Sequence, residues 1–220
     1  MGPGETGHQI FEWDRDLPEM DTGPGKCLRH HLVCVARWAE MNPDQLAKAV
    51  QCPIKRASVW ALHITSAMER HQIDTPERQA AFLAQVGHES SRLQFVREIW
   101  NPVQCPWQAD YEGRADLGNT HPGDGERFNG RGLIQITGRA NYAACSIALF
   151  GHASRLLTNP ELLEQPEFAA QSAGWFWESH GCNELADKGD FRAITRKING
   201  GLNGYADRMS LLRSAESALA

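Results

Sequence analysis

Three short segments of this 220-residue chain carry the residue pattern that begins an α-helix. In each, a capping side chain precedes a proline, which suits the first helical position, and an acid, which suits the positive end of the helix dipole. The segments are Asn42-Pro43-Asp44, Thr75-Pro76-Glu77 and Asn159-Pro160-Glu161. The third helix is expected to be divided by Pro166 and to end at Gly181. This pattern predicts a fold that is mainly α.

Two more helices are predicted towards the C-terminus. Asp190 is a capping residue before Phe191–Asn199, and Gly200 follows that segment as a helix stop. A last helix is expected from about Ala206 to the end of the chain. Together with the helices above, these elements make a single helical domain over residues 41–220.

The segment 101–132 differs from the helical remainder because it is dense in Gly, Pro, Asn and Asp. Such a composition predicts a long irregular loop. The residues LIQIT at 133–137 alternate between apolar and polar, which predicts at most one short strand. A long polar loop inside a compact domain usually serves function, so the active residues are expected near it.

Residues 1–40 have a different character from the rest of the chain. They hold two Pro-Gly turns and show no sustained hydrophobic period, so we interpret them as an extension of weak intrinsic structure with one short helix near 28–39. Cys27, His30, His31 and Cys34 match no standard spacing of metal ligands. The sequence therefore predicts neither a metal site nor a cofactor.

Charge and hydropathy disfavour several classes of protein. The 22 basic and 27 acidic side chains give a net charge of −5, whereas a nucleic-acid-binding protein normally has a basic surplus. No apolar run approaches the ~18 residues of a membrane helix, so no membrane insertion is expected. The acidic N-terminus lacks the apolar core of a signal peptide, which predicts synthesis in the bacterial cytoplasm. None of the six cysteines forms a C-x-x-C pair, so free thiols are expected.

Two glutamates near the long loop are candidates for acid–base chemistry. Glu89 lies on a mostly apolar helix face, where burial favours the protonated form that a general acid needs, but it also lies three residues before Arg92 as a possible ion-pair partner. Glu98 is placed to be the second carboxylate of a glycosidase, or a surface residue beside Arg97. The surrounding HESSR lacks the second histidine of a zinc-protease motif, which excludes that chemistry.

Five motifs give the chain a resemblance to a known family. They are AFLAQVGHES, VREIWNP, YEGRADLGNTHPGDG, GRGLIQITGRANY, and KINGGLNG followed by ADR. In this order they resemble glycoside hydrolase family 19, in its bacterial and bacteriophage branch of endolysins and chitinase-like lysozymes. The resemblance extends over roughly residues 41–220. It implies a lysozyme-like, two-lobed helical fold and hydrolysis of β-1,4-linked N-acetylhexosamine polymers with inversion.

The resemblance also implies roles for individual residues. Glu89 matches the general acid, Glu98 the general base, and Thr137 the hydroxyl that orients the attacking water. Four polar residues match positions in the substrate cleft: Gln135, Asn141, Asn199 and Arg208. Two aromatic residues, Tyr142 and Trp100, are weaker candidates for stacking on sugars. Gln135 can instead be a core amide, and Arg208 a structural partner of Asp207 or another acid. Glu126 and Asn129 depart from the family pattern, which carries an aromatic and a basic residue there.

The favoured hypothesis is an endolysin-type lysozyme that cleaves peptidoglycan in the bacterial cell wall. A chitinase is the alternative within enzymes, because both polymers share the β-1,4 linkage. A catalytically inactive carbohydrate-binding protein is the third hypothesis, and the presence of both Glu89 and Glu98 disfavours it. A monomer is expected, and without a signal peptide it would reach the wall through a separate pore or delivery system.

Overall fold

The computed structural model describes residues 41–220 of the chain. The predicted extension 1–40, its short helix near 28–39 and the cluster of Cys27, His30, His31 and Cys34 lie outside the described residues. The division of the chain at Met41 therefore stays a prediction.

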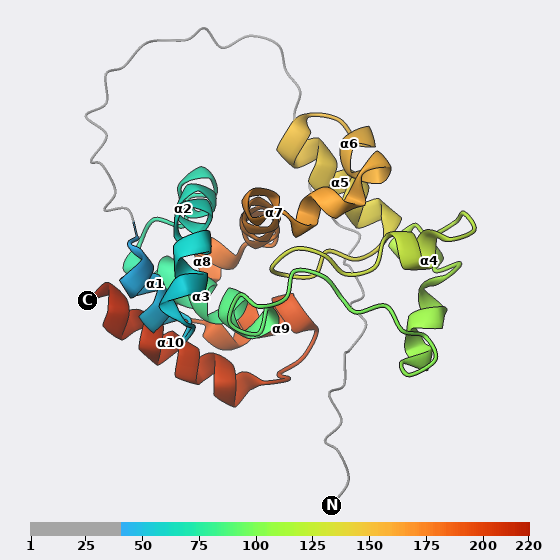
Figure 1. The fold of residues 1–220 in the computed structure, drawn as a ribbon. Helices are drawn as coiled ribbons and strands as arrows, with labels where there is room; N and C mark the ends of the chain where they lie inside the picture. The colour runs from blue at the N-terminus through green and yellow to red at the C-terminus, as the bar shows by residue number, and fades with distance from the viewer. Residues whose placement is uncertain (1–40) are drawn as a thin grey trace, which may run out of the picture.

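One lobe of the molecule is a bundle of six helices. α10 packs against α3 and α1, α2 packs against α1, and α8 contacts both α3 and α9 (Figure 1). The bounds of these helices are α1 Pro43–Ala49, α2 Ile54–Arg70, α3 Pro76–Glu89, α8 Cys182–Asp187, α9 Phe191–Asn199 and α10 Tyr205–Leu219.

The second lobe holds the irregular segment, the 3₁₀ helices and three α-helices. It contains η1 Pro106–Tyr111, η2 Ala115–Leu117, α4 Asp124–Arg127, α5 Arg139–Phe150, α6 Ser154–Thr158 and η3 Pro160–Glu164. α7 (Pro166–Ser179) lies between the lobes, because it packs against α2 on one side and α5 on the other (Figure 1). The expected mainly helical, two-lobed, lysozyme-like fold is confirmed.

The capping residues act as the sequence predicts. Asn42 and Gln45 form a reciprocal capping box, Thr75 accepts from the amide of Arg78, and Asp190 accepts from the amide of Ala193. Each side chain satisfies an amide that has no partner inside its helix. These three helix starts are therefore fixed by local chemistry.

The third predicted helix start is different in detail. Pro160 begins the 3₁₀ helix η3, and the α-helix begins only at Pro166. A proline disfavours helical backbone in the residue before it, and Gln165 is accordingly extended, with φ −75° and ψ 137°. The division at Pro166 is confirmed, and α7 ends just before Gly181.

The predicted short strand over 133–137 is a tight turn. Arg131 makes isolated bridges to Ile136 and to Arg97, and the residues between 131 and 136 form the turn. Leu133, Ile134 and Ile136 are all buried. The apolar alternation therefore comes from a turn that inserts side chains into the core rather than from a sheet.

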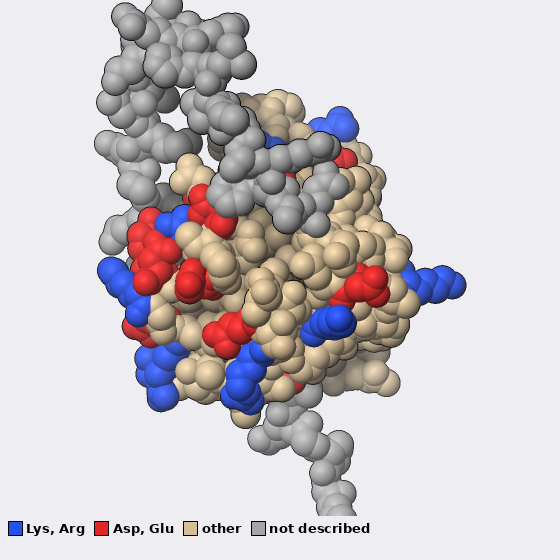
Figure 2. All heavy atoms as spheres, turned by 90° about the vertical axis from the view of Figure 1, so that its left-hand side faces the viewer, with Lys and Arg blue, Asp and Glu red and all other residues tan. Residues whose placement is uncertain are grey.

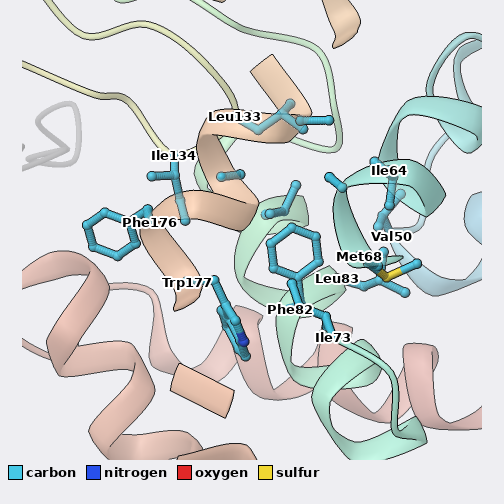
Figure 3. Close-up of a cluster of buried hydrophobic side chains, with 14 of the residues drawn as sticks. Val50, Ile64, Met68, Ile73, Phe82, Leu83, Leu133, Ile134, Phe176 and Trp177 are labelled. Atoms are coloured by element: carbon cyan, nitrogen blue, oxygen red, sulfur yellow. The ribbon is translucent and has the colours of Figure 1, made fainter. Parts of the chain in front are cut away.

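The turn and the helices share one hydrophobic core. Ile134 lies beside Phe176 of α7 (Figure 3), the amide of Leu133 donates to the carbonyl of Ala169 on the same helix, and Phe82 of α3 belongs to the same cluster. The rings of Phe82 and Trp177 meet edge to face, with centroids 5.4 Å apart. This shared core anchors the irregular segment to the helical lobe, so residues on both can form one site.

Charged side chains of both signs are interspersed on the face that Figure 2 shows. A mixed surface of this kind does not create the single-sign field that steers a polyanion to a protein. No helix in the described part of the chain is long and apolar enough to cross a membrane.

Candidate active site

Glu89 is the last residue of α3, and its carboxylate faces α10. Arg208 donates from Nη2 to Oε1 of Glu89 at 2.5 Å. The Arg208 side chain is 2% exposed and that of Glu89 15% exposed. Glu89 is therefore paired with Arg208, and the alternative of an ion pair with Arg92 is wrong, because Arg92 pairs with Asp207.

A chain of buried polar groups holds Arg208 in place. Its Nη1 donates to the side-chain oxygen of Gln85, and its Nε donates to the carbonyl of Asn203 at 3.1 Å. Gln85 in turn donates to the hydroxyl of Thr195 at 2.9 Å. The alternative interpretation of Arg208, a structural partner of an acid, is therefore confirmed with Glu89 as that acid, whereas its role as a substrate contact stays a prediction.

A second ion pair links the same two helices. Asp207 accepts from Arg92 and contacts Nδ1 of His88 at 2.6 Å. The Arg92 guanidinium, with a smaller contribution from His88, lowers the pKa of Asp207 to about 2. Neighbouring residues of α10, Asp207 and Arg208, thus bind neighbouring residues of α3, His88 and Glu89.

The chain reverses direction directly after Glu89. Ser91, Arg92 and Leu93 have φ of 50°, 63° and 62°, which is the left-handed region that non-glycine residues seldom occupy. The hydroxyl of Ser90 donates to the carbonyl of Val86 and accepts from the amide of Leu93, which fixes the turn. The chain therefore turns between Glu89 and Glu98, and the turn begins at Ser91.

Glu98 is fixed from two sides. Gln108 of η1 donates to Oε1 at 2.9 Å, and the amide of Gly130 donates to Oε2 at 3.3 Å. The backbone amide of Glu98 also donates to the carbonyl of Gly130 at 2.8 Å. The hydroxyl of Tyr111 lies 3.5 Å from Oε1, and burial together with the charge of Glu98 raises the pKa of Tyr111.

Arg97 does not pair with Glu98. Its Nη1 lies 3.6 Å from Oε1 of Glu164, which also accepts from Arg131 at 2.8 Å. The reading of Glu98 as a surface residue beside Arg97 is therefore wrong, because the carboxylate points into a set of hydrogen-bond donors.

Gln135 and Thr137 converge on Gly130. A Cβ at Gly130 would lie 2.6 Å from Oε1 of Gln135 and 3.3 Å from Oγ1 of Thr137, so a side chain at this position would have to displace the end of the Gln135 side chain. Because the amide of the same glycine reaches Glu98, the three side chains lie around one backbone position. The structure thus brings the predicted base and the predicted water-orienting hydroxyl together.

The hydroxyl of Thr137 is oriented by its own turn. It donates to the carbonyl of Gln135 at 3.0 Å, so what it offers to a water is its oxygen lone pairs. Asn141 supports the turn by donating to the carbonyl of Thr137 at 2.7 Å. Gln135 and Asn141 are partly exposed, and their roles as substrate contacts stay predictions.

Two of the other residues predicted to contact substrate form hydrogen bonds within the protein. Tyr142 is fully buried and its hydroxyl donates to the carbonyl of Asn129 at 2.7 Å, so the expectation that its ring stacks on a sugar is wrong. Asn199 is 6% exposed and bonds to Asn203 and Gly201, which shapes the loop before α10.

Trp100 stays a candidate for sugar stacking. It is partly exposed, two residues after Glu98, and its ring centroid lies 6.1 Å from that of Tyr111. Of the two departures from the family pattern, Glu126 is exposed on α4, whereas Asn129 is fully buried and donates to the carbonyl of Glu98 at 3.4 Å.

Sequence reasoning missed Gln85, Gln108 and Tyr111. Gln85 interrupts an apolar run, AFLAQVG, and a polar residue inside such a run is a signal that a buried partner exists. Gln108 and Tyr111 carry no such signal, because their segment is polar and irregular throughout. Among residues 41–220, no cluster of three or more His, Cys, Asp or Glu side chains is suited to hold a metal ion.

Comparisons with known proteins extend these observations. No family model matches the chain. A Haemophilus influenzae protein described as containing a glycosyl hydrolase family 19 domain is 31% identical in an alignment of 176 positions that covers 69% of this chain and 84% of that protein. An Arabidopsis thaliana endochitinase is 37% identical over 56% of this chain, but the match spans only 38% of that protein.

Solved structures of bacterial chitinases share the fold. Chitinase C from Streptomyces griseus has a TM-score of 0.63 and 25% identity, over 81% of this chain and 76% of that one. A structure described as a bacterial family 19 chitinase has a TM-score of 0.65 and 23% identity, over 82% of this chain and 95% of that one.

Proposed function

Because this chain belongs to glycosyl hydrolase family 19, we propose that it is an endo-acting enzyme that cleaves β-1,4 links of N-acetylhexosamine polymers with inversion. The observation that carries the mechanism is the grouping of Glu98, Gln135 and Thr137 around Gly130. An inverting glycosidase needs a base and a held water on one side of the sugar, and an acid on the other.

The water side of the reaction follows from the hydrogen bonds. A water between Glu98 and Thr137 would donate one hydrogen to the carboxylate and the other to the hydroxyl oxygen, since the Thr137 hydroxyl itself donates to Gln135. As the water oxygen attacks the anomeric carbon, Glu98 accepts its proton.

The leaving-group side belongs to Glu89. Arg208 approaches Oε1, so the proton for the glycosidic oxygen is assigned to Oε2. When the bond between the anomeric carbon and the glycosidic oxygen breaks, the electron pair stays on that oxygen and Oε2 delivers its proton there. The proton taken by Glu98 replaces the one lost by Glu89 over the full cycle, so the reaction needs no other reactant than water.

Chitin is the substrate that the comparisons favour, because the named relatives and structural neighbours include chitinases. Peptidoglycan is the second candidate, based on the resemblance of the motifs to the bacterial and phage branch. Both polymers present N-acetyl groups, and the partly exposed amides of Gln135 and Asn141 can bond to such groups as donor and acceptor.

The test is hydrolysis of two substrates by three proteins. Wild type, Glu89→Gln and Glu98→Gln are assayed on a soluble N-acetylglucosamine hexamer and on purified peptidoglycan. We expect turnover only by the wild type, and the substrate with the higher kcat/KM identifies the natural class. Binding of both substrates by the wild type with no turnover would instead support the inactive carbohydrate-binding alternative and overturn the proposal.

A further inference from the structure

Gln108 is a buried amide whose bonds all end at the segment that carries Glu98. Gln108 lies in the 3₁₀ helix η1 and is 2% exposed. Its Nε2 donates both to Oε1 of Glu98 at 2.9 Å and to the carbonyl of Ile99 at 2.8 Å. Its Oε1 accepts from the amide of Asn101 at 2.5 Å. One side chain therefore fixes the carboxylate and the backbone that follows it.

We propose that Gln108 is the positioning residue of the general base: it orients the Glu98 carboxylate and favours its ionised form. This inference rests on the proposed function, in which Glu98 accepts a proton from water. Gln108 donates to Oε1 and Gly130 to Oε2, so the plane of the carboxylate is set by two donors from different parts of the chain.

The other side chains around Glu98 do not orient its carboxylate as closely as Gln108 does. Arg97 and Arg131 direct their charges to Glu164. The Tyr111 hydroxyl is 3.5 Å away and its raised pKa keeps it neutral, while Asn129 contacts only the Glu98 carbonyl. Within the described residues, the amide of Gln108 is thus the side-chain donor with the shortest bond to this carboxylate. A hydrogen bond to the charged form stabilises it, so its removal favours protonation of the base.

Two substitutions of Gln108 separate its orientation of the Glu98 carboxylate from its support of the backbone at Asn101. Gln108→Met has a similar length but removes both the donor to Glu98 and the acceptor for Asn101. Gln108→Glu keeps the acceptor for Asn101 and puts a second carboxylate beside Glu98, so that the two must share a proton. Gln104→Met is the matched control, because the exposed Gln104 lies in the same segment and, among residues 41–220, its hydrogen bonds go to Asn101 alone.

The first measurement is independent of activity. The side-chain carboxyl of Glu98 is titrated by ¹³C NMR in protein labelled at glutamate, with Glu98→Gln to assign its signal. We expect the midpoint to rise by about one pH unit in Gln108→Met and by more in Gln108→Glu, and to stay in place in Gln104→Met. Unchanged midpoints in folded Gln108 variants would overturn the inference, whatever the substrate proves to be.

The second measurement is the pH profile of kcat on the substrate that the wild type cleaves. We expect the acidic limb of both Gln108 variants to move to higher pH, with kcat at neutral pH lowered about tenfold or more and KM within about threefold. A loss of thermal stability with a wild-type pH profile would make Gln108 a purely structural residue. Failure of the wild type to cleave either polymer would overturn the proposed function but not the NMR result.

Discussion

Among the described residues, the hydrogen bond to the Glu89 side chain reaches Oε1 only. The proposed chemistry uses the other oxygen, Oε2. Glu89→Gln keeps the shape of the side chain and an acceptor for Arg208 but removes the proton that the leaving oxygen needs. We expect kcat to fall by ~10²–10⁴-fold or more, with the fold and sugar binding retained. Steady-state kinetics and isothermal titration check the two parts. Glu77→Gln, exposed on the same helix, is the control, and a near-normal rate in Glu89→Gln would exclude Glu89 as the acid.

Thr137 is a second residue whose role can be read from kinetics. Thr137→Val keeps the volume and removes the oxygen that is expected to orient water, so kcat should fall more than KM rises. Thr137→Ser restores the oxygen and should recover most of the rate. If Thr137→Val raised KM and left kcat unchanged, Thr137 would be a substrate contact instead.

The residue types at the site were predictable, but their partners were not. The motifs identify Glu89, Glu98 and Thr137 by resemblance, whereas the partner of Glu89 lies 119 residues away on α10. Which acid a buried arginine meets is decided by the packing of α10 on α3, and adjacent Asp207 and Arg208 point to different partners. Local sequence gives no information on such a choice. The burial of Tyr142 has the same origin, because its hydroxyl is needed by a backbone carbonyl inside the core.

At the level of elements, helix starts were predictable because capping is local chemistry. Asn42, Thr75 and Asp190 each bond to an amide three residues ahead. The turn at 132–135 was not predictable, because its apolar residues alternate as those of a strand do. Only tertiary contacts distinguish such a turn from a strand. Gln135 has a left-handed backbone conformation, with φ 60°, which its residue type does not predict.

The irregular segment has its own structural anchor. Asp124, at the start of α4, makes a two-pronged ion pair with Arg139 of α5, at 2.5 Å and 2.8 Å, and the aspartate side chain is 2% exposed. Asp124→Asn removes the charge from a buried acceptor of a guanidinium that is itself 27% exposed, so it should lower the free energy of unfolding by about 2 kcal/mol at pH 7. Thermal or urea unfolding measures this change.

The pH dependence of that effect has a definite sign. The Arg139 guanidinium lowers the pKa of Asp124 below its usual value near 3.8, so the ion pair contributes stability above that value and loses it as pH falls through the lowered pKa. The difference between wild type and Asp124→Asn should therefore shrink steadily below about pH 4. Asp116→Asn, which removes an exposed partner of Arg114 in the same segment, should change stability far less. An equal loss in both variants would contradict the role of burial.

At the scale of the whole molecule, the two predicted catalytic carboxylates are supported by different parts of the fold. Glu89 is held by α10 of the helical lobe, whereas Glu98 is held by η1 and by Gly130 in the irregular segment. The hydrophobic core shown in Figure 3 joins the two parts through Leu133 and Ile134. Substitutions in that core should therefore change the geometry between the carboxylates as well as stability.

The described residues begin at Met41, which is 6% exposed and packs in the core. A protein that begins at Met41 keeps this contact and every contact of the two glutamates named above, so it should retain the activity and melting temperature of the full chain. Parallel assays and calorimetry of the two proteins decide. A loss of more than about tenfold in activity would show that residues 1–40 contribute to the cleft.

The stereochemistry of the product tests the arrangement of both lobes at once. A base that acts on water needs a gap of ~6.5–9.5 Å between the carboxyl groups, whereas a nucleophile that bonds to the sugar needs ~5 Å. The turn at Ser91–Leu93 redirects the chain between the two glutamates, and the Gly130 loop holds Glu98 beside Thr137, which is the environment of a base with a water. We therefore expect a β-linked substrate to release α-anomer first. Proton NMR of the fresh product resolves the two anomers before mutarotation, and an initial β-anomer would mean that Glu98 attacks the sugar itself.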